Sequence, residues 1–235
     1  MAAEICSYVT PYRLYRYRSL KNFDREMDAL KKGYVYCSSY VDLNDPMEGV
    51  YTPSRLLRKS DDAEAVTREV FDQKSSIRIC SFSEVYGHEL MWAHYADQFG
   101  GICIAYNFSD LREKLPDGTE FTRMYYNEEI PTVGKTKKPA VEIAKRVLSY
   151  KNHRWLYERE WRMFAPRPRV DYRDPACVYR VYLGNRILPE NRQKLTQITD
   201  QLGIEHRMMN IDGYELSFPS GAPRKRKRRA STRSS

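Results

Sequence analysis

Apolar residues alternate with polar ones, or recur at helical spacing, along most of the chain up to residue 218. Period-two alternation and short apolar runs predict strands; these segments are 14–20, 34–39, 77–82, 102–108, 121–126, 178–183 and one or two strands within 207–218. Spacings of three and four predict helices; these are 22–32, 61–72, 88–98, 141–150 and 190–202. Because strands and helices follow no single regular repeat, we expect an α+β fold whose mixed or antiparallel sheet is flanked by helices.

Two of the helices have features that indicate how they begin, end and pack. The helix at 22–32 is followed by Gly33, a residue that commonly ends helices. The helix at 61–72 begins with acidic residues, which interact favourably with the helix dipole. Its spacing predicts an inner side made of Val66, Val70 and Phe71.

The N-terminal module mixes aromatic and charged residues. In the strand at 14–20, alternation puts Arg16 and Arg18 on one face and the neighbouring tyrosines on the other. The module ends in a polar loop at 42–49, whose Asn, Asp, Pro and Gly residues favour turns. An exposed loop of this kind can line the mouth of a cleft.

The stretch KNHRWLYEREWR at 151–162 allows two interpretations. As a strand, it would direct Glu158, Glu160 and Arg162 to one face, about 6.5–7 Å apart along the chain. Two carboxylates beside aromatic rings suit a polar ligand and stabilise a positive charge that develops on it. As a helix, the same charges would form a solvated face, with each pair worth roughly a few tenths of a kcal/mol.

The charge is concentrated at the C-terminus. Of the formal net charge of +9, seven positive charges come from residues 224–233, which leaves +2 for the remainder. We therefore expect one α+β domain over residues 1–218 and a disordered basic tail over 219–235. Lys and Arg neutralise phosphates without regard to sequence, so the tail is a candidate for binding DNA or RNA, or an import receptor. The basic residues of this candidate site are Arg224, Lys225, Arg226, Lys227, Arg228 and Arg229.

The cysteines and the apolar runs bear on the compartment. The five cysteines are widely spread and form no CxxC motif, and three lie in apolar runs, as is typical of buried free thiols in a reducing compartment. Neither an N-terminal signal peptide nor an apolar run of about 20 residues is present. We expect a cytoplasmic protein without a membrane partner, with the nucleus as the alternative if the chain acts in a eukaryotic cell.

Common catalytic and metal-binding motifs are missing. The sequence has no GxGxxG after a strand, no GxxxxGK[ST], no HExxH and no GxSxG. The four histidines lack metal-ligand spacing, so no metal site is expected. His94 in MWAHYAD is a candidate general acid or base, and Trp92 a candidate stacking residue, although both also suit a buried core. A nuclease site made of acidic residues and a histidine is a further alternative; its members would be Asp45, Glu48, His94 and Glu160.

Five segments together carry a family resemblance. They are LYRYRSL, YCSSYVDLNDPMEG, ICSFSE, LMWAHYADQFGGICIAYN and KNHRWLYEREWR. In order and character they resemble the bacterial family catalogued as domain of unknown function 2971, over most of residues 14–218. That resemblance implies no activity.

The same segments resemble, more weakly, the motifs of ADP-ribosyltransferases. Those enzymes begin with a strand that carries Arg, His or Tyr, followed by a helix that ends at Gly. A serine-bearing strand and a late Glu-x-Glu come after them. Arg16 or Arg18 resembles the residue of the first strand, Ser81-Phe82-Ser83 resembles the serine-bearing strand, and Glu158-Arg159-Glu160 resembles the Glu-x-Glu. The resemblance implies a split sheet and NAD as the substrate of a transferase or glycohydrolase, of the kind deployed as toxins or antiphage effectors. The macromolecular acceptor stays open.

The resemblance also implies a role for each residue. Glu160 would stabilise the oxocarbenium-like state electrostatically, and Glu158 would activate or position the acceptor. Arg16 or Arg18 would bind the pyrophosphate, the two serines would orient the ribose, and Tyr17 or a tryptophan would stack on nicotinamide. The substrate-binding candidates are Arg16, Tyr17, Arg18, Asn44, Asp45, Glu48, Ser81, Ser83, Trp92, Tyr95 and Arg162.

Overall fold

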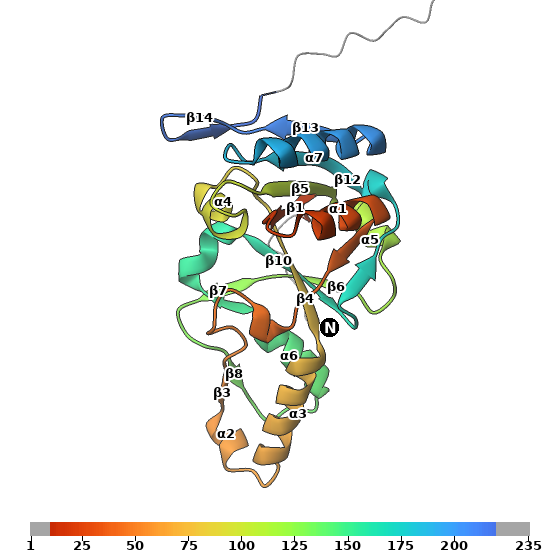
Figure 1. The fold of residues 1–235 in the computed structure, drawn as a ribbon. Helices are drawn as coiled ribbons and strands as arrows, with labels where there is room; N and C mark the ends of the chain where they lie inside the picture. Colours follow the sequence, from red (N-terminus) through yellow and green to blue (C-terminus); the bar gives the residue numbers. More distant parts are fainter. Residues whose placement is uncertain (1–9, 220–235) are drawn as a thin grey trace, which may run out of the picture.

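The computed structural model describes residues 10–219, and their main feature is a seven-stranded sheet (Figure 1). In spatial order its strands are β13 (Glu205–Met208), β12 (Val178–Leu183), β5 (Ile102–Asn107), β1 (Arg13–Arg18), β4 (Arg78–Ser83), β10 (Glu160–Ala165) and β6 (Glu120–Arg123). All neighbours are antiparallel except β12 and β13, which are parallel. The expected α+β fold with a mixed sheet is therefore confirmed.

Seven helices accompany the strands in the described residues. They are α1 (Phe23–Lys32), α2 (Arg55–Arg58), α3 (Ala63–Ser76), α4 (Glu89–Tyr95), α5 (Phe108–Lys114), α6 (Ala140–Val147) and α7 (Pro189–Leu202). Three short 3₁₀ segments are η1 (Tyr40–Asp42), η2 (His153–Glu158) and η3 (Pro175–Cys177). No helix within residues 10–219 is long and apolar enough to span a membrane.

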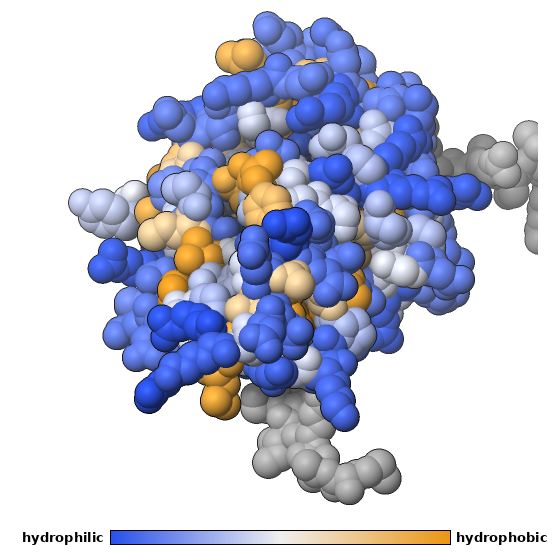
Figure 2. All heavy atoms as spheres, turned by 90° about the horizontal axis from the view of Figure 1, so that it is seen from below, coloured by the Kyte–Doolittle hydropathy of each residue, from blue (hydrophilic) through white to orange (hydrophobic). Residues whose placement is uncertain are grey.

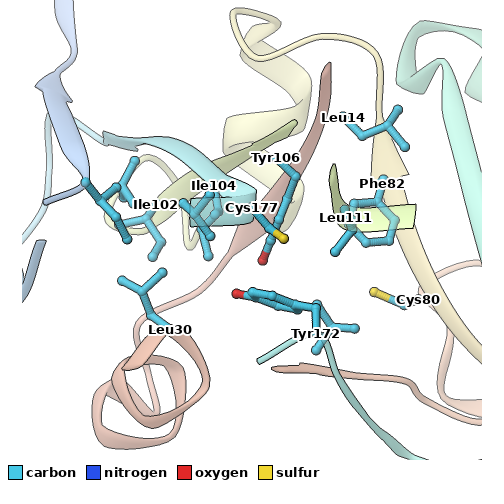
Figure 3. Close-up of a cluster of buried hydrophobic side chains, with 14 of the residues drawn as sticks. Leu14, Leu30, Cys80, Phe82, Ile102, Ile104, Tyr106, Leu111, Tyr172 and Cys177 are labelled. Carbon is cyan, nitrogen blue, oxygen red and sulfur yellow. The ribbon is translucent and has the colours of Figure 1, made fainter. Parts of the chain in front are cut away.

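Helices pack on both faces of the sheet, as the alternation of side chains requires. On one face, Leu30 of α1, Leu111 of α5 and Leu195 of α7 join the side chains of Leu14 and Phe82 in the largest core cluster. Figure 3 shows part of this cluster, with Tyr106 of β5 and Tyr172 facing each other across it. On the other face, α4 and α6 cover separate parts of the sheet.

A smaller lobe lies below the sheet in the view of Figure 1. It contains α2, α3, α6 and the short parallel pair β3 (Thr52–Pro53) and β8 (Thr132–Val133), with Val70 and Ile143 in its core. Seen from this side, the surface is mostly hydrophilic with small separate hydrophobic groups (Figure 2). The inward position expected for Phe71 is wrong: its side chain is 54 % exposed, because Val70 takes the buried position next to it.

Short strand pairs complete the fold. They are β2 (Tyr34–Tyr36) with β11 (Arg169–Asp171), β7 (Tyr125–Asn127) with β9 (Tyr150–Asn152), and β14 (Asn210–Asp212) with β15 (Glu215–Ser217). The single strand expected at 121–126 is wrong, because the chain changes partner at Met124, from β10 to β9. The one or two strands expected at 207–218 are in fact β13, β14 and β15.

The stretch at 151–162 combines both interpretations. Its first residues belong to β9, the middle forms the 3₁₀ segment η2, and the last residues begin β10. Arg159 separates η2 from β10 with a left-handed backbone (φ 45°). This sharp change of direction brings Glu158 near the face that Glu160 and Arg162 share.

The sheet is opened between β1 and β4. These two strands share one register pair, Tyr15 with Ser83, whereas β1 shares six pairs with β5 and β4 shares six with β10. Beyond that pair, β4 forms a bridge with Ser38 instead. The split gives side chains from both faces of the sheet access to one space.

Candidate functional site

A pocket of about 240 Å³ lies at the split between β1 and β4. Its lining comes from β1, from β4, from the segment after β2, from α4 and from β9–β10, which are distant in the sequence. The expected site residues among the lining are Arg16, Tyr17, Arg18, Asn44, Glu48, Ser81, Ser83, Tyr95, Glu158 and Glu160. Ten side chains singled out from the sequence thus meet in one place.

The two serines of β4 have different surroundings. Ser81 is exposed to the pocket, and it hydrogen-bonds to the carboxylate of Glu160 on the neighbouring strand. Ser83 is buried; its hydroxyl donates to the carbonyl oxygen of Glu158 at 2.6 Å and accepts from the amide of Val85 at 3.0 Å. Ser81 therefore has its hydroxyl at the pocket surface, whereas Ser83 fixes the backbone at Glu158.

Three carboxylates share two buried cations. Lys151 Nζ lies 2.6 Å from Glu158, 3.2 Å from Glu160 and 3.3 Å from Glu48. Arg162 lies 2.6 Å from Glu48 and 2.9 Å from Glu160. All five side chains are at least nine-tenths buried, and together they carry one net negative charge. We call these five residues the buried ion network.

Further hydrogen bonds fix the network in position. Arg162 also donates to the carbonyl oxygen of Leu148 at 2.5 Å. The hydroxyl of Tyr95 donates to Glu158 at 2.5 Å, and the amide of Glu160 donates to the hydroxyl of Tyr126 at 2.8 Å. Removing one member of such a buried group leaves an unpaired charge, which typically costs about 3–5 kcal/mol.

The two glutamates at 158 and 160 differ in their acidity. Burial alone would raise the pKa of Glu160, but the positive charges of Arg162 and Lys151 outweigh it and lower that pKa to about 2. For Glu158, burial is the larger effect and raises the pKa above its usual value, although Lys151 opposes it. A pair of carboxylates with diverging pKa values is the arrangement that assigns one group to charge stabilisation and the other to proton transfer.

The two arginines of β1 also differ. Arg18 binds both oxygens of Glu26, at 2.8 Å through Nε and at 2.6 Å through a terminal nitrogen. Arg16 donates to the carbonyl oxygen of Tyr36 at 2.8 Å, and it belongs to none of the ion pairs formed within residues 10–219. Arg16 therefore has the less neutralised charge of the two at the pocket.

Some of the expected site residues do not line this pocket. Trp92 is fully buried, donates to the carbonyl oxygen of Tyr86 and packs edge-on against Tyr17, so it is a core residue. His94 is exposed on α4 and contacts Trp155 instead. Arg162 and Asp45 are buried and do not line this pocket: Arg162 belongs to the ion network, whereas Asp45 accepts from the amide of Met47 and lines a second, smaller cavity.

Other site residues were missed from the sequence. Lys151, at the centre of the ion network, was treated as one of several charges in its stretch. Tyr126 was taken only as part of a strand. Tyr36 and Ser38 line the pocket because the bridge between Ser38 and Ile79 holds their segment beside β4. The neighbours of Tyr126, Tyr36 and Ser38 are distant in sequence. Lys151 lies seven and nine residues before Glu158 and Glu160, and a strand would place residues at such odd separations on opposite faces.

Two other expectations concern metal and nucleic acid. Within residues 10–219, no group of three or more His, Cys, Asp and Glu residues is arranged to hold a metal ion. The basic residues at 224–229 lie outside the described part of the chain.

Comparison with protein families gives a match to part of the chain. The model of the family described as Protein of unknown function (DUF2971) matches residues 91–163, and this confirms the family resemblance noted in the sequence. The matched segment runs from α4 to β10 and includes four of the five network residues. No curated protein and no solved structure matches the chain, so the resemblance to ADP-ribosyltransferases has no support from these comparisons.

Proposed function

We propose that the protein cleaves the bond between nicotinamide and ribose in NAD, and that it transfers the ADP-ribosyl group to water or to an acceptor. The observation that carries the proposal is that the strands bearing the arginine, serine and glutamate motifs, β1, β4 and β10, are consecutive neighbours and line one pocket.

Glu160 is suited to the bond-breaking step. When the bond from C1′ to the nicotinamide nitrogen breaks, nicotinamide leaves with the electron pair and positive charge develops on the ribose. A carboxylate with a pKa of about 2 is ionised at neutral pH and already fixed in place by Arg162 and Lys151. Charge stabilisation by a group that does not need to reorganise is usually the largest catalytic effect.

Glu158 is suited to the second step. Water or an acceptor group attacks C1′ and must lose a proton, and a carboxylate with a raised pKa accepts it well near neutral pH. Tyr95 holds one oxygen of this carboxylate and Lys151 the other. The two glutamates thus have separate roles.

The size of the pocket and its arginines determine how NAD would lie. Pockets for drug-sized ligands measure about 300–1,000 Å³, so a cavity of about 240 Å³ would enclose the nicotinamide and its ribose only. Ser81 would bond to a ribose hydroxyl, and Arg16 would bind the pyrophosphate, since a guanidinium pairs with phosphate oxygens. Arg18 is less suited because Glu26 occupies it.

The test is release of nicotinamide from NAD by the full chain, measured by chromatography. We expect release by the wild type, and a loss of about 10²–10³-fold in kcat for Glu160→Gln. Glu113→Gln, at a side chain that is 77 % exposed on α5, is the matched control and should keep full activity.

Two further measurements keep the test decisive. Circular dichroism and thermal unfolding establish that Glu160→Gln is folded, and Ser81→Ala, which removes one hydroxyl exposed to the pocket, should raise KM in a protein of near wild-type stability. A folded wild type that yields neither nicotinamide nor an ADP-ribosylated product in a cell extract would refute the proposal. Full activity of folded Glu160→Gln would refute the role of that residue.

A further inference from the structure

A pair of cysteines lies beside the pocket and has no part in the chemistry proposed above. Cys37 follows β2 and Cys80 lies in β4, and both are buried and free. Between them, Ser38 and Ile79 exchange two backbone hydrogen bonds, each of 2.8 Å. In antiparallel pairing, the next pair along, Cys37 with Cys80, is then a non-hydrogen-bonded pair.

This register places the two thiols within reach of each other. In non-hydrogen-bonded pairs the Cα atoms lie about 4.5 Å apart and the side chains are close, and disulfides span Cα distances of about 4.4–6.8 Å. The Cys37 thiol hydrogen-bonds to the sulfur of Cys80. A disulfide between them needs little movement of the backbone.

The surroundings of the pair favour reaction at Cys80. Burial raises the pKa of Cys80, but the hydrogen bond from Cys37 and the positive charge of Arg16 lower it to about 7. The hydrogen bond to Cys80 and burial raise the pKa of Cys37, which stays protonated. The thiolate is the reactive form of cysteine. Cys80 lines the pocket, and it also belongs to the core cluster, where Figure 3 shows it near Phe82 and Tyr172.

We propose that Cys37 and Cys80 form a reversible disulfide when a peroxide enters the pocket, and that this disulfide strengthens anion binding at Arg16. The Cys80 thiolate attacks one peroxide oxygen, the O–O bond breaks, and with one proton from solvent the products are water and a Cys80 sulfenic acid. The Cys37 thiol then attacks the Cys80 sulfur, the S–S bond forms and a second water leaves. The two thiols lose two electrons, and the peroxide gains them.

The link to Arg16 is electrostatic. In the reduced protein, the positive charge of Arg16 stabilises the thiolate form of Cys80, and Arg16 forms no ion pair with a carboxylate among the described residues. The disulfide is neutral, so oxidation removes this negative neighbour and leaves the guanidinium available to an anion in the pocket. Only the identity of that anion rests on the proposed function; the disulfide itself does not.

The test begins with mapping of the thiols. The reduced full chain is treated with equimolar hydrogen peroxide, its free thiols are alkylated after denaturation, and its peptides are analysed by mass spectrometry. We expect one cross-linked peptide pair that contains Cys37 and Cys80, lighter by two hydrogen atoms and restored by a dithiol. Cys103 and Cys177, the other buried thiols, should be alkylated in full.

Matched variants and a binding measurement complete the test of the disulfide. Cys37→Ser should trap a sulfenic acid on Cys80 that reacts with dimedone, and Cys103→Ser should behave as the wild type. Calorimetry with inorganic pyrophosphate should give a several-fold lower Kd for the oxidised protein, and no change after peroxide treatment of Cys80→Ser, which has no thiolate beside Arg16. Free Cys37 and Cys80 after peroxide treatment would overturn the disulfide, and an unchanged Kd would overturn its effect on Arg16; neither result depends on NAD cleavage.

Discussion

Glu158 and Glu160 lie two residues apart and share Lys151 as a partner, yet their surroundings move their pKa values in opposite directions. The difference comes from Arg162, which contacts Glu160 and not Glu158 among its ion pairs. Arg162 is on the same strand face as Glu160, so the strand period itself brings the second cation to one glutamate only. The division of roles proposed for the two carboxylates follows from this arrangement.

The low pKa of Glu160 predicts a dependence of stability on pH. Its folded-state pKa of about 2 is below the usual glutamate value of 4.5, so its contribution to stability is present above pH 4.5 and is lost as the pH falls towards 2. Urea unfolding across this pH range should show a smaller decrease in the free energy of unfolding for Glu160→Gln than for the wild type. Equal losses in the two proteins would contradict the prediction; comparing the two proteins removes the effect of other carboxylates with lowered pKa, such as Glu26 and Glu84.

Tyr95 provides a test of the acid–base role of Glu158. Its hydroxyl donates to the ionised carboxylate and lowers the pKa of Glu158, although burial keeps that pKa above its usual value. Tyr95→Phe should raise the pKa further, so the acidic limb of the profile of kcat against pH should move to higher pH.

The loss of a hydrogen bond to an ionised carboxylate should cost this variant about 1.5–3 kcal/mol of stability. The control is Tyr125→Phe, at a ring on β7 that is 54 % exposed and outside the pocket lining, and its profile should match the wild type. An unmoved acidic limb in Tyr95→Phe would assign proton transfer to another group.

At the scale of elements, the sequence predicted those helices and strands whose ends are set by neighbouring residues. Helix α1 ends at Gly33, as the pattern predicted, and the backbone of this residue is left-handed. The helix begins after Asn22, whose side chain accepts from the amide of Arg25. The stretch at 151–162 was ambiguous because it contains part of a strand, a 3₁₀ segment and part of another strand. The pairing of β10 with β4 that fixes it involves residues about 80 positions away, and single-sequence patterns do not report such pairing.

The connection between α4 and β5 offers a test of how an element positions the pocket. Asp97, Gln98 and Phe99 all have left-handed backbones there, and a Cβ added to Gly101 would lie 2.2 Å from the carbonyl oxygen of Arg18, at the end of β1. Gly101→Ala must therefore displace β1, and we expect it to lower the free energy of unfolding by about 1–3 kcal/mol, as overpacking does.

The matched control is Gly87→Ala, where an added Cβ meets nothing within 4 Å. This variant should unfold within about 0.5 kcal/mol of the wild type, as surface substitutions generally do. Chemical denaturation of both proteins gives the comparison, and equal stability would mean that β1 has more room at Arg18 than the packing indicates.

At the scale of the whole molecule, the site depends on long-range packing. The sequence identified Arg16, Ser81, Glu158 and Glu160 because their motifs occur in a known order. It missed Lys151, because a lysine becomes buried only when carboxylates surround it, and one of these, Glu48, is about 100 residues away. His94 and Trp92 were expected at the site because helical spacing does not tell which side of α4 faces the pocket.

The charge of the whole chain predicts how its C-terminal residues would bind nucleic acid. Residues 220–235 hold seven of the excess positive charges, and the rest of the chain has a net charge of +2. If the tail neutralises DNA phosphates, about seven released counterions give a slope of about −6 in a plot of log K against log salt concentration. A chain that ends at Pro219 should lose most of this affinity and slope, because few excess positive charges remain.

A full-length variant with glutamine at all six positions from 224 to 229 separates charge from length, and it should bind almost as weakly as the truncated chain, because Arg233 alone of the seven basic residues remains. Duplexes of unrelated sequence should bind equally well, because phosphate contacts carry no sequence information. Both altered chains should release nicotinamide from NAD at the wild-type rate, since the pocket lining found within residues 10–219 runs from Tyr15 to Glu160. Binding that keeps its slope without the basic residues would instead assign DNA contact to the folded part of the chain.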